Sequence, residues 1–426
     1  MTKKQTPNIS IQEKKRLTLE GQKAVSDSRN PKFSDGFKTI IRDQGGHLIH
    51  ELIQNAQDTG ATEIKIELHL DKLEFWHNGS SFSYTNIESL TSLGSSDKSE
   101  DKSKIGKFGF GFKSVFSITN KPIIKCDTCC FEIVDVFCPV FLPNQDTKGW
   151  TQLIFEFIDG QESKIHQDLK IKLQNDITER SILFLSNIQK LYILVLQDQS
   201  NITISKEIVD RNQFKEIEVY FSKDKLSQTK NYLYFNQKLE YEDKKIDYSL
   251  CYQYQTKNNE YEFVKIENTN NLSVYFPTKD IFQLSFLVNA GFVTGSSREN
   301  CEQRDVFNSK LFLCLRQLII DSILILRDLN ILNLSFLDLF SKLESQSCIY
   351  DFNNQLHQKI QTTLKKEKVI PVEDSHRYDT LPNCAMLSDE ILRFFDTNEM
   401  IALNFDKSLV DTKVNTKLQL VKFFET

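Results

Sequence analysis

The most constraining feature of this sequence is a helix-like segment with a polar stripe, followed further along the chain by a glycine-rich run. Glu51, Asn55 and Asp58, at i, i+4 and i+7, fall on one stripe of the predicted helix. The run 106–114 predicts a tight turn that enters a helix, and its bare backbone N–H groups can hold phosphates. Together the two segments suit a magnesium nucleotide, with Asn55 as an oxygen ligand and Glu51 as a base for water. The apolar face of this helix is predicted to consist of Leu48, Ile49, Leu52, Ile53 and Ala56.

Length and composition narrow the class of protein. A chain of 426 residues has room for two or three domains with substantial cores. A net charge of −5 with both signs abundant disfavours a globally basic nucleic-acid binder. The sequence has no apolar run of membrane-spanning length, and Met1 does not begin a signal peptide. Nine cysteines without a small-scaffold framework fit a reducing compartment. We therefore expect a cytoplasmic protein without a membrane partner.

Hydrophobic periodicity predicts a mixed order of helices and strands in the first part of the chain. Ile64, Ile66 and Leu68 alternate with polar residues and predict a half-buried strand. The run 94–107 is Ser-, Lys- and Asp-rich and predicts a mobile loop. This order fits an α/β sandwich with a mixed sheet. The other predicted elements are a charged helix at 10–28, a strand ending at 77–79, a short helix at 83–92, and strands near 121–137 and 151–158.

The pattern changes after residue 188. Short apolar or alternating runs between Leu191 and Val288 predict a β-rich second region. A strongly apolar stretch from Val306 to Leu326 begins a mostly helical third region. We place the domains at 1–187, 188–303 and 304–426.

Two alternative sites were weighed against this interpretation. His47 and His50 lie near Glu51, but the spacing and order are wrong for a helical zinc-protease motif. Four cysteines lie in predicted apolar strands without a second paired set, which favours buried thiols over a metal cluster. They are Cys126, Cys129, Cys130 and Cys138.

The two segments together resemble the N box and the glycine-rich lid box of the GHKL ATPases, which include DNA gyrase, the large heat-shock chaperone, histidine kinases and MutL. The step His77-Asn78-Gly79, the following Phe82 and the run 106–116 resemble most closely the branch named for sacsin and the plant NO VEIN protein. The resemblance is strong over 40–155. Weaker similarity continues at 184–188, 286–292, 296–300 and 369–371.

The resemblance implies an α+β fold: a GHKL (Bergerat) two-layer sandwich, then a β-rich transducer-like domain and a helical C-terminal region. It implies ATP and Mg²⁺ as ligands, with Glu51 as the base and Asn55 on the metal. It also implies Arg298, with Arg304 as the alternative, as a cation that reaches the terminal phosphate. His77 stands where most relatives have an aspartate that accepts a hydrogen bond from the adenine amino group, so Asn78 or Asp58 is expected to contribute instead. The expected nucleotide contacts are Asn55, Asp58, His77, Asn78, Gly79, Gly106, Lys107, Phe108, Gly109, Phe110, Gly111, Phe112, Lys113 and Thr151.

The implied function is magnesium-dependent ATP hydrolysis that drives a conformational cycle on a macromolecular client, with 94–107 as a closing lid. The resemblance implies a chaperone-like biological role or, if the protein is bacterial, a role in defence or quality control. A protein client or partner subunit and a nucleotide-dependent homodimer are expected. Three alternatives stay open: a non-hydrolysing, ATP-gated scaffold, a histidine kinase and a DNA-processing ATPase.

Overall fold

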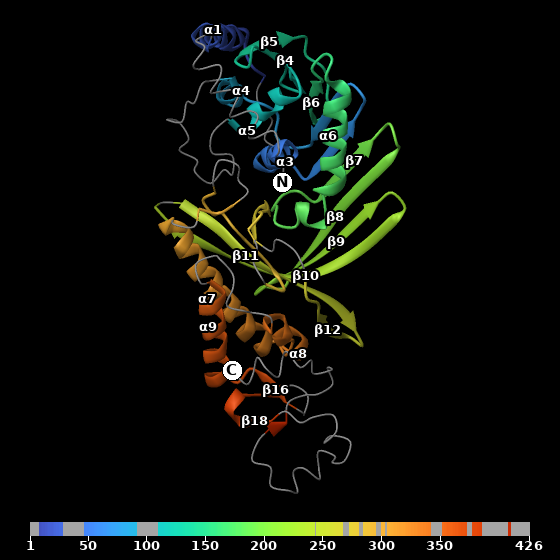
Figure 1. Ribbon diagram of the computed structural model, residues 1–426. Helices are drawn as coiled ribbons and strands as arrows, with labels where there is room; N and C mark the ends of the chain where they lie inside the picture. Colours follow the sequence, from blue (N-terminus) through green and yellow to red (C-terminus); the bar gives the residue numbers. More distant parts are fainter. Residues whose placement is uncertain are drawn as a thin grey trace. The chain divides into compact units, whose positions relative to one another are not determined.

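The computed structural model describes residues 8–28, 47–91, 110–242, 244–266, 272–280, 284–294, 300–302, 305–341, 352–372, 377–385 and 408–409. The chain divides into two compact units (Figure 1). Unit 1 comprises Met1–Glu207 and Val219–Thr229, and unit 2 comprises Ile208–Glu218 and Lys230–Thr426. Three strands have residues in both units: β8 (Ser200–Asp210), β9 (Lys215–Lys223) and β10 (Leu226–Tyr241).

Unit 1 contains a mixed sheet. Its strands follow the order β8-β7-β1-β2-β6-β3-β4-β5. The pair β1 and β7 is parallel, whereas the neighbouring pairs from β1 to β5 and the pair β7 and β8 are antiparallel. The bounds are β1 (Glu63–Leu68), β2 (Lys72–His77), β3 (Ile123–Cys126), β4 (Cys129–Val134), β5 (Cys138–Leu142), β6 (Thr151–Glu156) and β7 (Lys190–Val195).

Register separates a buried face of this sheet from an open one. Ile64 lies opposite His77, and His77 lies opposite Thr151, so these three residues share one face. All three are buried. Lys65 and Trp76 face each other on the other side of the sheet, where Lys65 is exposed. The predicted alternation around Ile64 is therefore confirmed.

Helices of unit 1 contact this sheet and one another (Figure 1). Helix α6 contacts β1, α1 contacts β5 and α4, and α5 contacts α3. The bounds are α1 (Ile11–Ser28), α3 (Leu48–Asp58), α4 (Tyr84–Thr91), α5 (Phe110–Lys113) and α6 (Glu162–Asn175).

Helix α1 begins at a capping box and packs tightly on β5. The Glu13 N–H donates to Ser10 Oγ at 3.3 Å, and the Ser10 N–H donates to Glu13 Oε2 at 2.7 Å. Thr18 Oγ1 donates to the carbonyl of Pro139 at 2.9 Å. Gly21 lies so close that a Cβ added there would meet Phe137 O at 2.4 Å and Cys138 Cα at 2.6 Å. Only glycine fits at this contact without a shift of backbone.

We expect Gly21→Ala to destabilise the protein, although alanine ordinarily stabilises a helix by about 1 kcal/mol relative to glycine. The overlap with β5 is with backbone atoms, and such overpacking costs about 1–3 kcal/mol. Urea unfolding should show a lower midpoint with an unchanged slope. Lys23→Ala on the exposed side of the same helix is the control and should have no such effect.

Unit 2 combines helices with strands that pair mostly antiparallel, while β13 pairs with β15 and β18 with β19 in parallel. Its strand order is β14-β13-β15-β11-β10, and β12 pairs with β11. Helix α7 contacts β11 and α9, and α8 contacts β12 (Figure 1). The bounds are β11 (Lys244–Lys257), β12 (Glu260–Phe263), β13 (Leu272–Val274), β14 (Phe276–Pro277), β15 (Leu287–Ala290), α7 (Val306–Asp328), α8 (Leu334–Leu337), α9 (Phe352–Lys366), β16 (Ile370–Val372), β17 (Arg377–Asp379), β18 (Cys384–Ala385) and β19 (Ser408–Leu409).

Aromatic side chains dominate the core of unit 2. Tyr252 is buried with its ring 4.8 Å from that of Phe336 and 5.0 Å from that of Phe286. Its hydroxyl forms a hydrogen bond of 2.8 Å with Ser322 Oγ, so the polar end of the ring is also satisfied. This core joins β11, β15, α7 and α8 and includes the predicted apolar helix from Val306.

The mixed α/β architecture with a mixed sheet is compatible with the predicted α+β class. The helices predicted at 10–28 and 83–92 and the strands predicted around the Ile64 alternation are confirmed. Strand β5 and helix α6 were not predicted. The loop prediction at 94–107 falls outside the described residues. No described helix is both long enough and apolar enough to cross a membrane.

Candidate functional site

The polar-striped helix is α3, and its predicted apolar face is buried. Glu51 is buried on the polar side of this face, at 6% exposure, while Asn55 and Asp58 are half-buried. The helix ends where Gly60, at φ +74°, donates its N–H to Gln57 O and Ala61 donates to Ala56 O. These two bonds form a Schellman motif, which needs a residue that tolerates positive φ.

The end of the glycine-rich run lies against this helix, because α5 contacts α3. Phe112 and Lys113 are both buried there. Lys113 Nζ donates to the carbonyl of Leu90 at 3.2 Å and lies 5.4 Å from the centre of the Phe137 ring. Burial lowers the pKa of Lys113 to about 8. The two segments that the sequence pairs are thus neighbours in space.

The step His77-Asn78-Gly79 packs on the C-terminal end of α3. Thr59 O accepts a hydrogen bond from the Ser80 N–H at 3.0 Å. A Cβ at Gly79 would lie 1.9 Å from Thr59 Oγ1 and 3.0 Å from His77 Nδ1. The glycine of this step is therefore required by close approach.

Hydrogen bonding defines the tautomer of His77. The Gly79 N–H donates to His77 Nδ1 at 3.2 Å, so Nδ1 is unprotonated. Thr59 Oγ1 is also 3.4 Å from Nδ1, but its own hydrogen is directed to Ala56 O at 2.8 Å. A neutral His77 ring consequently carries its proton on Nε2.

Asn78 has a structural task in the same step. Its Oδ1 accepts from the N–H groups of Thr62 at 2.8 Å and Glu63 at 3.0 Å, and its Nδ2 donates to Thr62 Oγ1 at 2.9 Å. These bonds attach the end of β2 to the start of β1. A base contact by Asn78 stays a prediction and would require these bonds to rearrange.

Thr151 begins β6 directly opposite His77. It is fully buried, and its Oγ1 has no hydrogen-bond partner among the described residues. Burying a hydroxyl without a partner costs free energy, so such a group fits a site that receives a polar ligand. The buried face at His77 therefore includes an unsatisfied hydroxyl.

Gln57 is a residue of the site that the sequence analysis missed. It is buried, and its Oε1 accepts from the N–H groups of Asn187 at 3.0 Å and Ile188 at 3.2 Å. Its Nε2 donates to Ser186 Oγ at 2.6 Å. These bonds anchor α3 to residues 186–188, inside the stretch 184–188 that the sequence analysis singled out.

Arg298, Gly106, Lys107, Phe108 and Gly109 lie outside the described residues, as does Arg304. The residues on either side of 295–299 are described. Thr294 and Cys301 form an antiparallel bridge, and the side chain of Asn308 bonds to the backbone of Val293 and Glu302. The buried side chain of Asn308 therefore joins the described residues on either side of 295–299.

His50, one position before Glu51, is shifted strongly toward its neutral form. Burial, with a smaller contribution from His47, lowers the pKa of His50 to about 4. In the unfolded chain His50 has the ordinary histidine pKa of about 6.5, so it takes up a proton at a higher pH than in the folded protein. The stabilising contribution is therefore complete above pH 6.5 and is lost as the pH falls from 6.5 toward 4.

We expect His50→Gln to remove part of the acid sensitivity of the fold. In the wild type, protonation linkage at His50 alone predicts that the free energy of unfolding is about 2 kcal/mol lower at pH 5 than at pH 7.5. Urea unfolding at pH 7.5 and pH 5 measures it in both proteins. An equal loss of stability in the variant would contradict the assignment.

Other clusters of ligand-type side chains offer no comparable site. The four cysteines are buried free thiols, with Cys126 and Cys129 Sγ atoms 3.5 Å apart. Among the described residues, the only group of histidine, cysteine and acidic side chains close enough to share a cation is Glu67, His69 and Glu74. Lys72 already forms an ion pair with Glu74.

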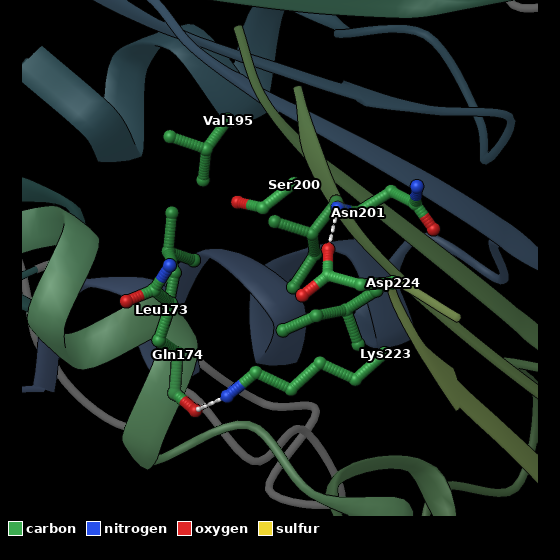
Figure 2. A pocket seen from close by; sticks show the side chains of 9 residues that line it. Leu173, Gln174, Val195, Ser200, Asn201, Lys223 and Asp224 are labelled. Atoms are coloured by element: carbon green, nitrogen blue, oxygen red, sulfur yellow. Dashed lines mark hydrogen bonds between the residues drawn. The ribbon is translucent and has the colours of Figure 1, made fainter. Parts of the chain in front are cut away.

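A small pocket also lies in unit 1, between α6 and strands β7 to β9 (Figure 2). Its two charged side chains have partners, because Lys223 Nζ donates to the carbonyl of Gln174 at 2.9 Å and Asp224 accepts from the N–H of Asn201 at 2.9 Å. No predicted site residue lines this pocket. We assign it no ligand.

Residues 74–148 match the family described as Sacsin domain, and this range includes the step at His77 and the glycine-rich run. The chain is 34% identical over 144 residues to Sacsin of Homo sapiens, covering 28% of this chain and 3% of that protein. It is 26% identical over 202 residues to Protein NO VEIN of Arabidopsis thaliana, covering 40% of this chain and 7% of that protein.

The family match makes residues 74–148 sacsin-like. The chain spans only a small fraction of the length of either relative. Among solved structures, the N-terminal domain of a DNA repair protein is similar at a TM-score of 0.28 and 12% identity, covering 43% of this chain and 70% of that one.

Proposed function

We propose that unit 1 binds ATP with Mg²⁺ in a GHKL-type site and hydrolyses it. The observation that carries this proposal is the contact of α5 with α3, which joins the end of the glycine-rich run to the helix of Glu51 and Asn55. The buried, unsatisfied hydroxyl of Thr151 supports a ligand beside His77. The sacsin-like match covers the step at His77 and the glycine-rich run, and Glu51, Asn55 and Thr151 lie outside it.

Each residue then has a chemical task. Glu51 accepts a proton from water as the water oxygen attacks the terminal phosphorus, and the bond from that phosphorus to the ADP oxygen breaks. Asn55 would hold Mg²⁺, whose charge, when it is bound, offsets that of the phosphates. The backbone of 106–111 would bind phosphate oxygens, and Lys113 would do so after releasing the carbonyl of Leu90. Arg298 would contact the terminal phosphate, and His77, Asp58 and Thr151 would surround the base.

Hydrolysis would drive a conformational cycle in which 94–107 closes over the nucleotide and a β-rich, transducer-like domain responds. A macromolecular client or partner subunit would use this cycle, in a chaperone-like or quality-control role. The alternative is an ATP-gated scaffold that binds without hydrolysis.

Phosphate release by the purified protein tests the proposal. We expect release that saturates with ATP and stops when EDTA removes the metal. Tight ATP binding without release would identify the scaffold instead. If a labelled ATP analogue also fails to bind with Mg²⁺ present, the nucleotide site itself is refuted.

A further inference from the structure

We propose that Cys126 and Cys129 are a redox-active pair that hydrogen peroxide converts into a reversible disulfide. Both cysteines are free thiols in the structure. They lie at the end of the β3–β4 hairpin, where the register pairs them directly across the two-residue turn Asp127-Thr128. Residues that are paired in register point to the same face of a sheet, and the two Sγ atoms are only 3.5 Å apart. This inference does not depend on the proposed nucleotide site.

The hairpin provides the geometry that a disulfide needs. Directly opposed residues of an antiparallel pair have Cα atoms about 4.5–5.5 Å apart, which lies within the range of about 4.4–6.8 Å that disulfides span. The sulfur atoms must approach by about 1.5 Å to reach bonding distance, and rotation of the side chains can supply that movement. Cys130 follows on β4 and points to the opposite face, so it does not compete for either sulfur.

The two thiols differ in reactivity. The hydrogen bond with Cys129 Sγ is the main cause that lowers the pKa of the Cys126 thiol to about 6, and it outweighs the opposing effect of burial. The same hydrogen bond and burial raise the pKa of Cys129. Because the thiolate is the nucleophile in thiol oxidation, Cys126 is expected to react first and Cys129 second.

The oxidation balances in two steps. The Cys126 thiolate attacks one peroxide oxygen, the O–O bond breaks, and hydroxide leaves and takes up the proton that Cys126 had released. Cys129 sulfur then attacks the sulfur of the sulfenic acid on Cys126, the S–O bond breaks, and its hydroxyl leaves as water with the Cys129 proton. Two thiols lose two electrons and two protons, and hydrogen peroxide is reduced to two molecules of water.

Access to the pair is through the turn. Both cysteine side chains are fully buried, whereas Asp127 between them is exposed. Oxidation therefore requires a local opening of the hairpin end, and a small oxidant such as hydrogen peroxide needs the least opening. Thr128 Oγ1 donates to the carbonyl of Phe82 at 2.8 Å, so the pair borders the segment that follows Gly79.

Peptide mapping after oxidation tests the proposal. The reduced full chain, freed of reductant, is treated with hydrogen peroxide, unfolded in urea and alkylated. We expect Cys126 and Cys129 to be protected from alkylation within one peptide that is lighter by two hydrogen atoms. Dithiothreitol added before alkylation should restore both sites. If both cysteines of the folded protein remain open to alkylation under conditions that oxidise the same chain in urea, the proposal is overturned.

Two variants identify the partners. Cys129→Ala should abolish the link and leave a sulfenic acid on Cys126, which dimedone labels. Cys130→Ser, a neighbour on the other face of β4, is the matched control and should form the link as the wild type does. A link that persists in Cys129→Ala, or one that needs Cys130, contradicts the assigned pair. If Cys129→Ala does not fold, mapping of the wild type and of Cys130→Ser decides the question.

Discussion

Glu51→Gln should lower ATP hydrolysis by about 10²–10⁴-fold while nucleotide affinity stays within a few-fold of the wild type. The side chain is buried on α3, four positions before Asn55, and glutamine preserves its shape but not its basicity. Single-turnover phosphate release and a binding titration measure the two quantities separately.

Glu67→Gln is the matched control. Glu67 lies on the open face of β1, away from the face shared by His77 and Thr151. The Glu67→Gln protein should therefore hydrolyse ATP at the wild-type rate. Normal turnover by Glu51→Gln would exclude Glu51 as the base. Loss of binding together with turnover would mean that Glu51 shapes the site.

Asn55→Ala should weaken nucleotide binding by about 10–100-fold when Mg²⁺ is present, which corresponds to about 1.5–3 kcal/mol for a contact to a charged group. The side chain is half-buried and lies one turn after Glu51 on α3. Titrations with Mg²⁺ and with EDTA give the metal-dependent part of the affinity.

Asn55→Asp retains an oxygen ligand and serves as the matched variant, so it should keep metal-dependent binding. A loss of the same size with and without the metal in Asn55→Ala would show that Asn55 supports the helix or the nucleotide and does not ligate Mg²⁺.

Elements that bury one side of a helix or strand could be predicted from the hydrophobic periodicity of the local sequence. The period of Leu48, Leu52 and Ala56 identified α3, and the alternation at Ile64 identified β1. Helix α6 had the same kind of signal, because Ile165, Leu169 and Leu173 are four apart and buried, and it was overlooked. Strand β5 contains Pro139, and a proline argues against a strand in a prediction from sequence. The pairing of β5 with β4 could therefore not be predicted from the local sequence.

The site was predictable as a set of residues but not as a set of contacts. Glu51, Asn55 and the glycine-rich run follow a spacing that the sequence displays. Gln57 bonds to residues 129–131 positions away, which no window of sequence can show. The tautomer of His77 likewise depends on how the turn places the Gly79 N–H. Such roles are defined by the folded backbone.

The packing of α1 on β5 has a consequence for self-association. β5 is the last strand in the order of its sheet, and an uncovered last strand is a template on which another chain can add a strand. Here Pro139 has no N–H to offer, Thr18 occupies its carbonyl, and the helix lies against the strand. A protein from which residues 1–28 have been removed would lose helix α1 as the cover of β5. We expect it to aggregate more readily, through strand addition at β5.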